Sequence, residues 1–172
     1  SIIPSNVNLA AAEIELIGVD KKEYILKNEI DWIRDQYDFI IIDCPPSLGL
    51  ITTNALNASD SVLIPVQCEY YALEGLSQLM SSVQAVKRRY NDRLELEGVL
   101  LTMYDGRLNL TQQVVTEIKK YFPRKVFATV IPRTVRLSEA PSYGQPILYY
   151  DKSNKGCIAY GALVDEILKK NR

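Results

Sequence analysis

The 172-residue chain contains no histidine, which excludes catalysis and metal binding that depend on an imidazole. Its three cysteines lie far apart with no Cys-x-x-Cys pair, so we expect neither a zinc site nor a disulfide framework. We expect the cysteines to be reduced thiols in a cytoplasm. The apolar runs are too short to cross a membrane. A phosphate-binding loop is also absent: no Gly-x-x-x-x-Gly-Lys-[Ser/Thr] occurs, and none of the 8 glycines precedes a lysine.

The composition is that of a globular domain, with 47% hydrophobic and 24% charged residues. The net charge of −1 hides an asymmetry. Residues 1–86 carry 4 basic and 12 acidic side chains, whereas residues 87–136 carry 11 basic and 5 acidic ones. Such a basic block can form a surface for polyanions, although solvated helix surfaces would give the same counts.

Apolar runs rich in β-branched residues alternate with segments of helical periodicity. The runs are residues 39–42, 62–66, 99–103, 126–131 and 147–150, with residues 2–4 as a short further candidate. The helical segments are residues 22–37, 73–90, 109–121 and 158–168. The spacing is too long for hairpins and fits βα units, and strands that are apolar throughout indicate a sheet covered on both faces. The sequence therefore predicts an α/β fold with a doubly wound, mostly parallel sheet.

The first run ends in Asp43, followed by Cys44 and the stiff pair Pro45-Pro46. We expect Asp43 at the carboxyl edge of the sheet, where a buried carboxylate needs a partner and α/β proteins bind nucleotides. A hydrated Mg²⁺ beside phosphates would provide that partner. The alternative is an aspartate that caps the next turn.

Five ordered motifs carry a family resemblance. They are residues 43–49, 64–76, 98–103, 130–133 and 135–144. This series closely resembles the ParA family of chromosome- and plasmid-partitioning ATPases, in the deviant Walker A (ParA/MinD) group, and the Soj-like branch most of all. The resemblance covers essentially residues 1–172 and implies a P-loop NTPase-like fold.

The resemblance implies a role for each matching residue. Asp43 would be the catalytic aspartate that acts on Mg²⁺ through water. The switch segment beside the γ-phosphate would contain Cys44, Pro45, Pro46, Ser47 and Gly49. The adenine of ATP would lie near Thr102, Met103, Pro132 and Arg133.

Arg107 and Arg136 match positions that bind DNA without sequence preference in this family, and both lie in the basic block. Contacts from arginine to phosphate would give salt-sensitive, sequence-independent affinity. Without the resemblance, Arg107 would be read as a solvated turn residue. Thr134 stands where the family usually has Asn, and Leu108 where Thr is common; neither change removes a charged contact, so we expect tuning rather than loss.

Family members begin with a strand and a Lys-Gly-Gly-x-Gly-Lys-Thr loop, followed by an Asp-x-Asp-Pro-Gln motif, and neither occurs in residues 1–172. We therefore expect this chain to be the C-terminal two-thirds of one ATPase domain, inactive alone, or to have its sheet closed by another copy. Without the family's first strand, residues 39–42 would lie at an exposed apolar edge.

In intact form the protein would bind ATP and Mg²⁺, form a homodimer, bind DNA nonspecifically and segregate chromosomes or plasmids with a ParB-type partner. It would lie in the bacterial cytoplasm on the nucleoid, with no membrane attachment. Two alternatives remain open: a non-catalytic module that binds DNA or a partner, and a MinD-like division-site ATPase. The MinD-like reading is disfavoured because the C-terminal residues 165–172 are short and partly acidic for a membrane-binding helix.

Overall fold

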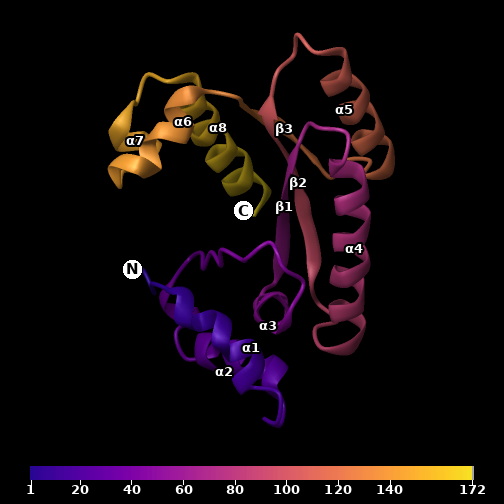
Figure 1. Ribbon diagram of the computed structural model, residues 1–172, viewed down its shortest axis with the longest axis vertical. Helices are drawn as coiled ribbons and strands as arrows, with labels where there is room; N and C mark the ends of the chain where they lie inside the picture. The colour runs from indigo at the N-terminus through magenta and orange to yellow at the C-terminus, as the bar shows by residue number, and fades with distance from the viewer. Residues whose placement is uncertain (172) are drawn as a thin grey trace. The chain divides into compact units, whose positions relative to one another are not determined.

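Three of the predicted strands form a parallel sheet in the computed structural model, which describes residues 1–171 (Figure 1). The strands are β1 (Ser61–Gln67), β2 (Glu95–Tyr104) and β3 (Val126–Pro132), in the order β1-β2-β3. The helices are α1 (Ala12–Glu15), α2 (Ile25–Asp31), α3 (Leu50–Ala58), α4 (Ala72–Arg89), α5 (Asn109–Tyr121), α6 (Val135–Glu139), α7 (Ile147–Tyr150) and α8 (Lys155–Lys170). Short 3-10 helices are η1 (Val7–Ala11), η2 (Lys22–Tyr24), η3 (Arg34–Gln36) and η4 (Ala140–Tyr143). The α/β fold class is confirmed.

The chain divides into two compact units. The first comprises Ser1–Val62 and Gln78–Glu95, and the second comprises Leu63–Ser77 with the chain from Leu96 onward. No helix within residues 1–171 is long and apolar enough to cross a bilayer.

In the second unit, helices cover both faces of the sheet, with α5 on one side and α8 on the other (Figure 1). The core against α8 consists of Leu100, Phe127, Ile131 and Leu163. Helix α5 buries Val114, Val115 and Ile118, which recur at the spacing of one helical face. Two-sided burial explains why these strands are apolar throughout rather than alternating.

The register between β2 and β3 is interrupted near the carboxyl end. Leu101 lies opposite Val130, and Tyr104 lies opposite Pro132, so β2 uses one more residue than β3 over this stretch. The extra residue is a β-bulge, and Met103 within it has the left-handed φ of 50° that bulges can require.

In the first unit, buried amides on α3 fix the preceding backbone. The Asn54 side chain accepts from the Leu26 N–H (3.1 Å) and donates to the Lys22 carbonyl (2.8 Å), while Asn57 donates to the Glu23 carbonyl (2.8 Å). A separate apolar cluster of this unit contains Leu56, Val83, Val86 and Leu94. These contacts pair both side-chain amino groups and the Asn54 oxygen, which would otherwise be costly to bury.

Several sequence predictions of secondary structure need correction. Residues 39–42 form no strand and no helix, and three of the four are exposed, with Ile41 91% exposed. A strand needs a hydrogen-bonded neighbour, and the described sheet consists of β1, β2 and β3 without one for this segment. Residues 2–4 likewise lie outside any strand.

Residues 147–150, also predicted as a strand, form helix α7. Pro146 precedes this helix, and its carbonyl accepts from the N–H groups of Tyr149 (2.9 Å) and Tyr150 (3.1 Å). A four-residue apolar run does not by itself distinguish strand from helix. The helices predicted at residues 73–90, 109–121 and 158–168 are confirmed as α4, α5 and α8, whereas residues 22–37 break into η2, α2 and η3.

The outer edge of β3 is held by a carboxylate from α8. Glu166 accepts hydrogen bonds from the backbone N–H groups of Ala128 (2.8 Å) and Thr129 (2.9 Å). Burial alone would raise the pKa of Glu166, but these hydrogen bonds outweigh it and hold the pKa below its usual range. Donors on an edge strand that would otherwise face solvent are thereby paired.

We predict that Glu166→Gln destabilises the protein at pH 7 by on the order of 1 kcal/mol, because the partly exposed carboxylate loses its charge and one acceptor oxygen. Since folding lowers this pKa, the difference from wild type should be full above the unfolded-state pKa and shrink as the pH falls through the folded-state pKa. Urea unfolding at pH 7 and pH 3 measures it. Asp165→Asn, which neutralises an exposed carboxylate on the same helix, should change little at either pH.

Candidate functional site

The carboxyl ends of β1 and β2 are tied together by Thr102. Its hydroxyl donates to the Val66 carbonyl (3.2 Å), and its own carbonyl accepts from the Cys68 N–H (3.3 Å). Met103 follows in its left-handed conformation with 40% of its surface exposed. This conformation is strained for a residue other than glycine, and such strained residues are common at functional sites.

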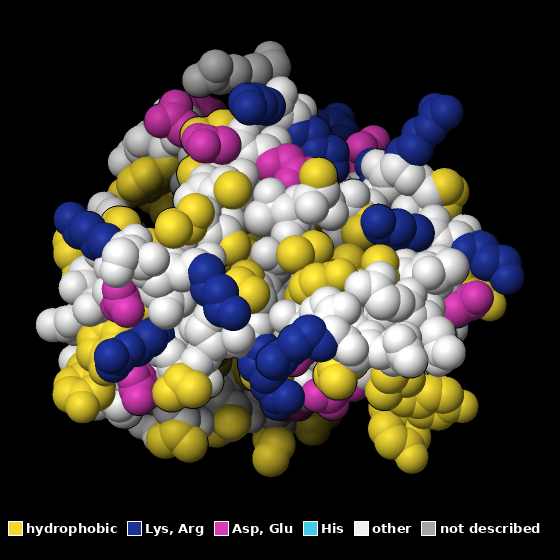
Figure 2. All heavy atoms as spheres, turned by 90° about the horizontal axis from the view of Figure 1, so that it is seen from above, with side chains coloured by type: hydrophobic (Ala, Val, Ile, Leu, Met, Phe, Trp, Pro, Cys, Tyr) yellow, Lys and Arg dark blue, Asp and Glu magenta, His cyan; other side chains and the backbone are white. Residues whose placement is uncertain are grey.

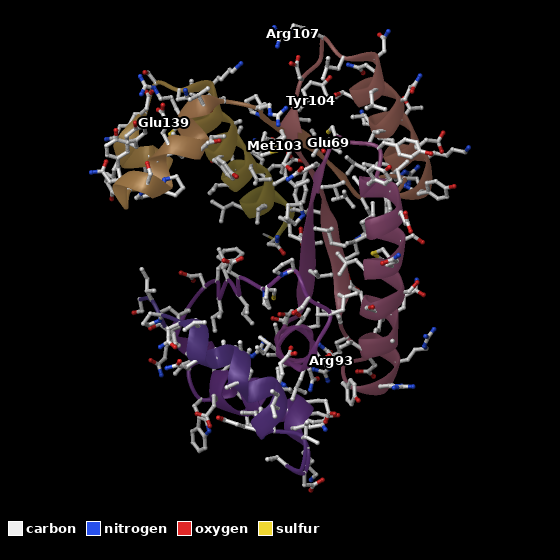
Figure 3. All side chains as sticks on the ribbon, in the orientation of Figure 1. Glu69, Arg93, Met103, Tyr104, Arg107 and Glu139 are labelled. Atoms are coloured by element: carbon white, nitrogen blue, oxygen red, sulfur yellow. The ribbon has the colours of Figure 1, made fainter. Side chains whose placement is uncertain are left out.

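Pro132 and Arg133 lie at the same edge. Pro132 is opposite Tyr104 in the ladder, and the Arg133 N–H donates to the Tyr104 carbonyl (3.2 Å). Figure 3 shows Met103 and Tyr104 at the end of β2, with Glu69 near them just beyond β1. Because parallel strands end at one edge, the residues predicted to meet the adenine come together: Thr102, Met103, Pro132 and Arg133.

The predicted switch segment belongs to the first unit. Asp43 is exposed and lies outside any strand, so the expectation of a buried strand-end carboxylate is wrong for this structure. Cys44, Pro45 and Pro46 are also exposed. Although Cys44 as a residue is exposed, neighbouring protein atoms partly desolvate its thiol, and this, followed by the charge of Asp43, raises the thiol pKa. This thiol is therefore a poor nucleophile at neutral pH.

The end of the segment is anchored to α3. The Thr52 hydroxyl donates to the Ser47 carbonyl (2.5 Å), and Gly49 forms the N-cap of the helix, where its carbonyl accepts from the Thr53 N–H (3.0 Å). Any displacement of residues 43–49 would thus begin from a fixed hinge at Ser47 and Gly49.

The donor set fits Mg²⁺ only in part. Within residues 1–171, no three acidic or cysteine side chains lie close enough together to hold a metal ion. Mg²⁺ is commonly bound through one or two carboxylates, waters and substrate phosphates, and the exposed Asp43 carboxylate can supply one such oxygen.

Both predicted DNA-binding arginines belong to the second unit and are paired with carboxylates. Arg107, on the loop after β2 (Figure 3), is 89% exposed and contacts Asp105 through Nη2–Oδ2 (2.6 Å) and Nε–Oδ1 (2.9 Å). Arg136 on α6 contacts Glu139 (3.0 Å) and Asp151 (3.7 Å). These carboxylate partners were not predicted from the sequence. The short spacings of Asp105 from Arg107 and of Glu139 from Arg136 are nevertheless visible there.

The basic side chains of residues 87–136 do not form one continuous positive surface on the face shown in Figure 2. Its members Lys87, Arg88 and Arg89 lie in the last turn of α4, and Lys119 and Lys120 in that of α5, where positive charge favours the helix dipole. Figure 2 shows Lys and Arg side chains dispersed among acidic and apolar ones on the face it presents. Much of the charge asymmetry therefore has a local structural explanation.

Thr134 acts as the N-cap of α6, a role that the sequence analysis did not assign. Its hydroxyl accepts from the Leu137 N–H (3.2 Å) and contacts Asn154 Oδ1 (3.2 Å). Asn, common at this position in the family, is an equally good N-cap residue. The expectation of tuning rather than loss now has a physical basis, since either residue can begin the helix that carries Arg136.

Comparison with known proteins identifies the family. A family model described as "AAA domain" matches residues 1–96. The chain is 58% identical over 166 residues to the sporulation initiation inhibitor protein Soj of Bacillus subtilis, and 52% identical over 170 residues to the chromosome partitioning protein ParA of Myxococcus xanthus. The chain belongs to the ParA/Soj family of chromosome-partitioning ATPases.

These alignments cover 96% and 99% of this chain, and 66% and 60% of the two relatives. This ParA/Soj family member thus spans less than two thirds of the length of either. Its structure is similar to that of cobyrinic acid a,c-diamide synthase from Mycobacterium smegmatis with bound ATP analogue and magnesium, at a TM-score of 0.82 and 34% identity over 96% of this chain and 61% of that one. Structures related to this family thus bind nucleotide and Mg²⁺.

We predict that Thr134→Ala destabilises the protein by about 1 kcal/mol, because α6 loses its N-cap acceptor, whereas Thr134→Asn changes stability by only a few tenths of a kcal/mol. Thermal unfolding of the two variants beside wild type measures the difference. Equal stability of both variants would show that the cap does not stabilise this helix.

Proposed function

We propose that this chain is part of a ParA-type partitioning ATPase that binds ATP and Mg²⁺, dimerises, binds DNA without sequence preference and acts with a ParB-type partner in segregating DNA. The observation that carries the proposal is the convergence of four predicted nucleotide-site residues at one sheet edge: Thr102, Met103, Pro132 and Arg133. The named relatives, described as chromosome partitioning and Soj proteins, support it.

The proposed chemistry assigns one role to each group. Mg²⁺, when bound with ATP, neutralises the phosphate charge during phosphoryl transfer. Asp43 orients water on the metal side, and the segment from Asp43 to Gly49 responds to the γ-phosphate from its anchor on α3. The strand-end residues enclose the adenine, and the P-loop of the longer protein supplies the phosphate-binding lysines.

DNA binding is assigned to the exposed guanidinium groups of Arg107 and Arg136. Phosphate contacts from arginine position a protein on DNA without reading its sequence, which suits a protein that must bind anywhere on the nucleoid. The cargo, chromosome or plasmid, is left to the partner.

The decisive variant is Asp43→Ala in the full-length gene product. We predict that it loses ATP-dependent binding to a long duplex of arbitrary sequence, measured by fluorescence anisotropy with ATP and Mg²⁺, and that EDTA does the same to wild type. Asp38→Ala, which removes another exposed carboxylate of the same unit, should bind as wild type does.

DNA binding that is unchanged by Asp43→Ala, by EDTA and by omission of ATP would contradict the ATPase cycle. It would favour the second reading of the sequence, a non-catalytic DNA-binding module.

A further inference from the structure

The guanidinium of Arg107 is exposed to solvent, but two of its N–H donors are already bound to a carboxylate. Its Nε and Nη2 form two parallel hydrogen bonds with the carboxylate of Asp105, at 2.9 and 2.6 Å. Phosphate uses the same fork of donors as a carboxylate, so both cannot chelate this edge at once.

The pair is local and self-contained. Asp105 Oδ1 also accepts from the Arg107 backbone N–H (3.1 Å), which closes a turn in the loop between β2 and α5. The side chain of Arg107 is 89% exposed, and within residues 1–171 it contacts no acidic group other than Asp105, so it can exchange this carboxylate for another anion. The hydrogen bonds from Arg107 hold the pKa of Asp105 well below its usual range, and the carboxylate stays ionised at physiological pH.

Arg136 is restrained in the same way but by more groups. Its Nη1 donates to Glu139 Oε2 (3.0 Å), its Nε lies 3.7 Å from Asp151 Oδ2, and its guanidinium lies 5.9 Å from the ring centre of Tyr150. Tyr150 in turn donates to Glu139 Oε2 (3.2 Å). These contacts join α6 to the end of α7, so releasing Arg136 would also loosen the packing of those helices.

We propose that Asp105, and in the same way Glu139, acts as an intramolecular substitute for DNA phosphate that weakens DNA binding by its arginine. The inference rests on the proposed DNA-binding role of these arginines. An exposed ion pair is only weakly favourable, so the carboxylate reduces affinity without abolishing it. Each pair would keep DNA binding reversible, as a protein that must leave DNA in every cycle requires.

Asp105→Asn is the clean test of this proposal, because Asn keeps the Oδ1 acceptor that closes the turn and loses the charge. We predict that the DNA affinity of the full-length protein with ATP rises by roughly two- to fivefold, measured on a duplex of arbitrary sequence. The plot of log affinity against log salt should also steepen, by less than about 0.9, the value for one whole phosphate contact, because wild-type Arg107 already makes this contact part of the time.

Two controls separate competition from a general change in charge. Asp165→Asn removes one exposed negative charge from the same unit, far along the chain on α8, and should raise affinity less than Asp105→Asn and leave the salt slope unchanged. In an Arg107→Ala background, Asp105→Asn should give no more than the Asp165→Asn effect, because there is no guanidinium to release.

Equal gains from Asp105→Asn and Asp165→Asn, or the same gain with and without Arg107, would overturn the inference while leaving DNA binding intact. If Arg107→Ala binds DNA as tightly as wild type, the DNA role of Arg107 itself fails, and the inference falls with it. The salt slope of the Arg107→Ala protein distinguishes these cases.

Discussion

The parallel pairing of β2 with β3 is the constraint on which the candidate site depends. Parallel strands deliver their carboxyl ends to one edge, so Thr102 and Arg133 become neighbours although 30 residues of chain separate them. The ladder also imposes the bulge that turns Met103 out of the regular strand. Helices α5 and α8, packed on the two faces, keep this edge rigid while its loops remain exposed.

Charge in this protein is organised by pairing rather than by large fields. The arginines expected to meet DNA are matched by nearby carboxylates, and the lysines and arginines of helix ends serve the helices themselves. A family member that binds DNA through few, already engaged arginines would bind weakly, and its affinity would fall with salt by only about 0.9 in the logarithmic slope for each phosphate contact. Such binding suits transient residence on DNA better than stable attachment.

The elements that the sequence predicted well are those with long, regular patterns. Strands β1, β2 and β3 follow from apolar runs buried on both faces, and α4, α5 and α8 from helical periodicity. Residues 39–42 are as apolar as the runs that form β1, β2 and β3, yet a strand exists only where a neighbour pairs with it, which composition does not encode. Helix α7 was predicted as a strand because a short apolar run fits either structure. The N-cap position of Pro146, directly before Ile147, was the sequence signal for a helix.

The sequence indicated which residues could form the candidate site, but not their contacts. Parallel strand pairing places Thr102, Met103, Pro132 and Arg133 at one edge, and their role toward nucleotide stays a prediction. The left-handed bulge and the ion pairs of Arg107 and Arg136 depend on register and loop geometry, which no motif specifies.

The central claim is that nucleotide binds at the carboxyl edge of β2 and β3. Hydrogen–deuterium exchange of the full-length protein with and without ATP and Mg²⁺ tests it most directly. The account predicts new protection at residues 102–104 and 132–134 and in the switch segment at residues 43–49, with none at the carboxyl end of α5. Saturating nucleotide that leaves exchange at residues 102–104 and 132–134 unchanged would contradict it.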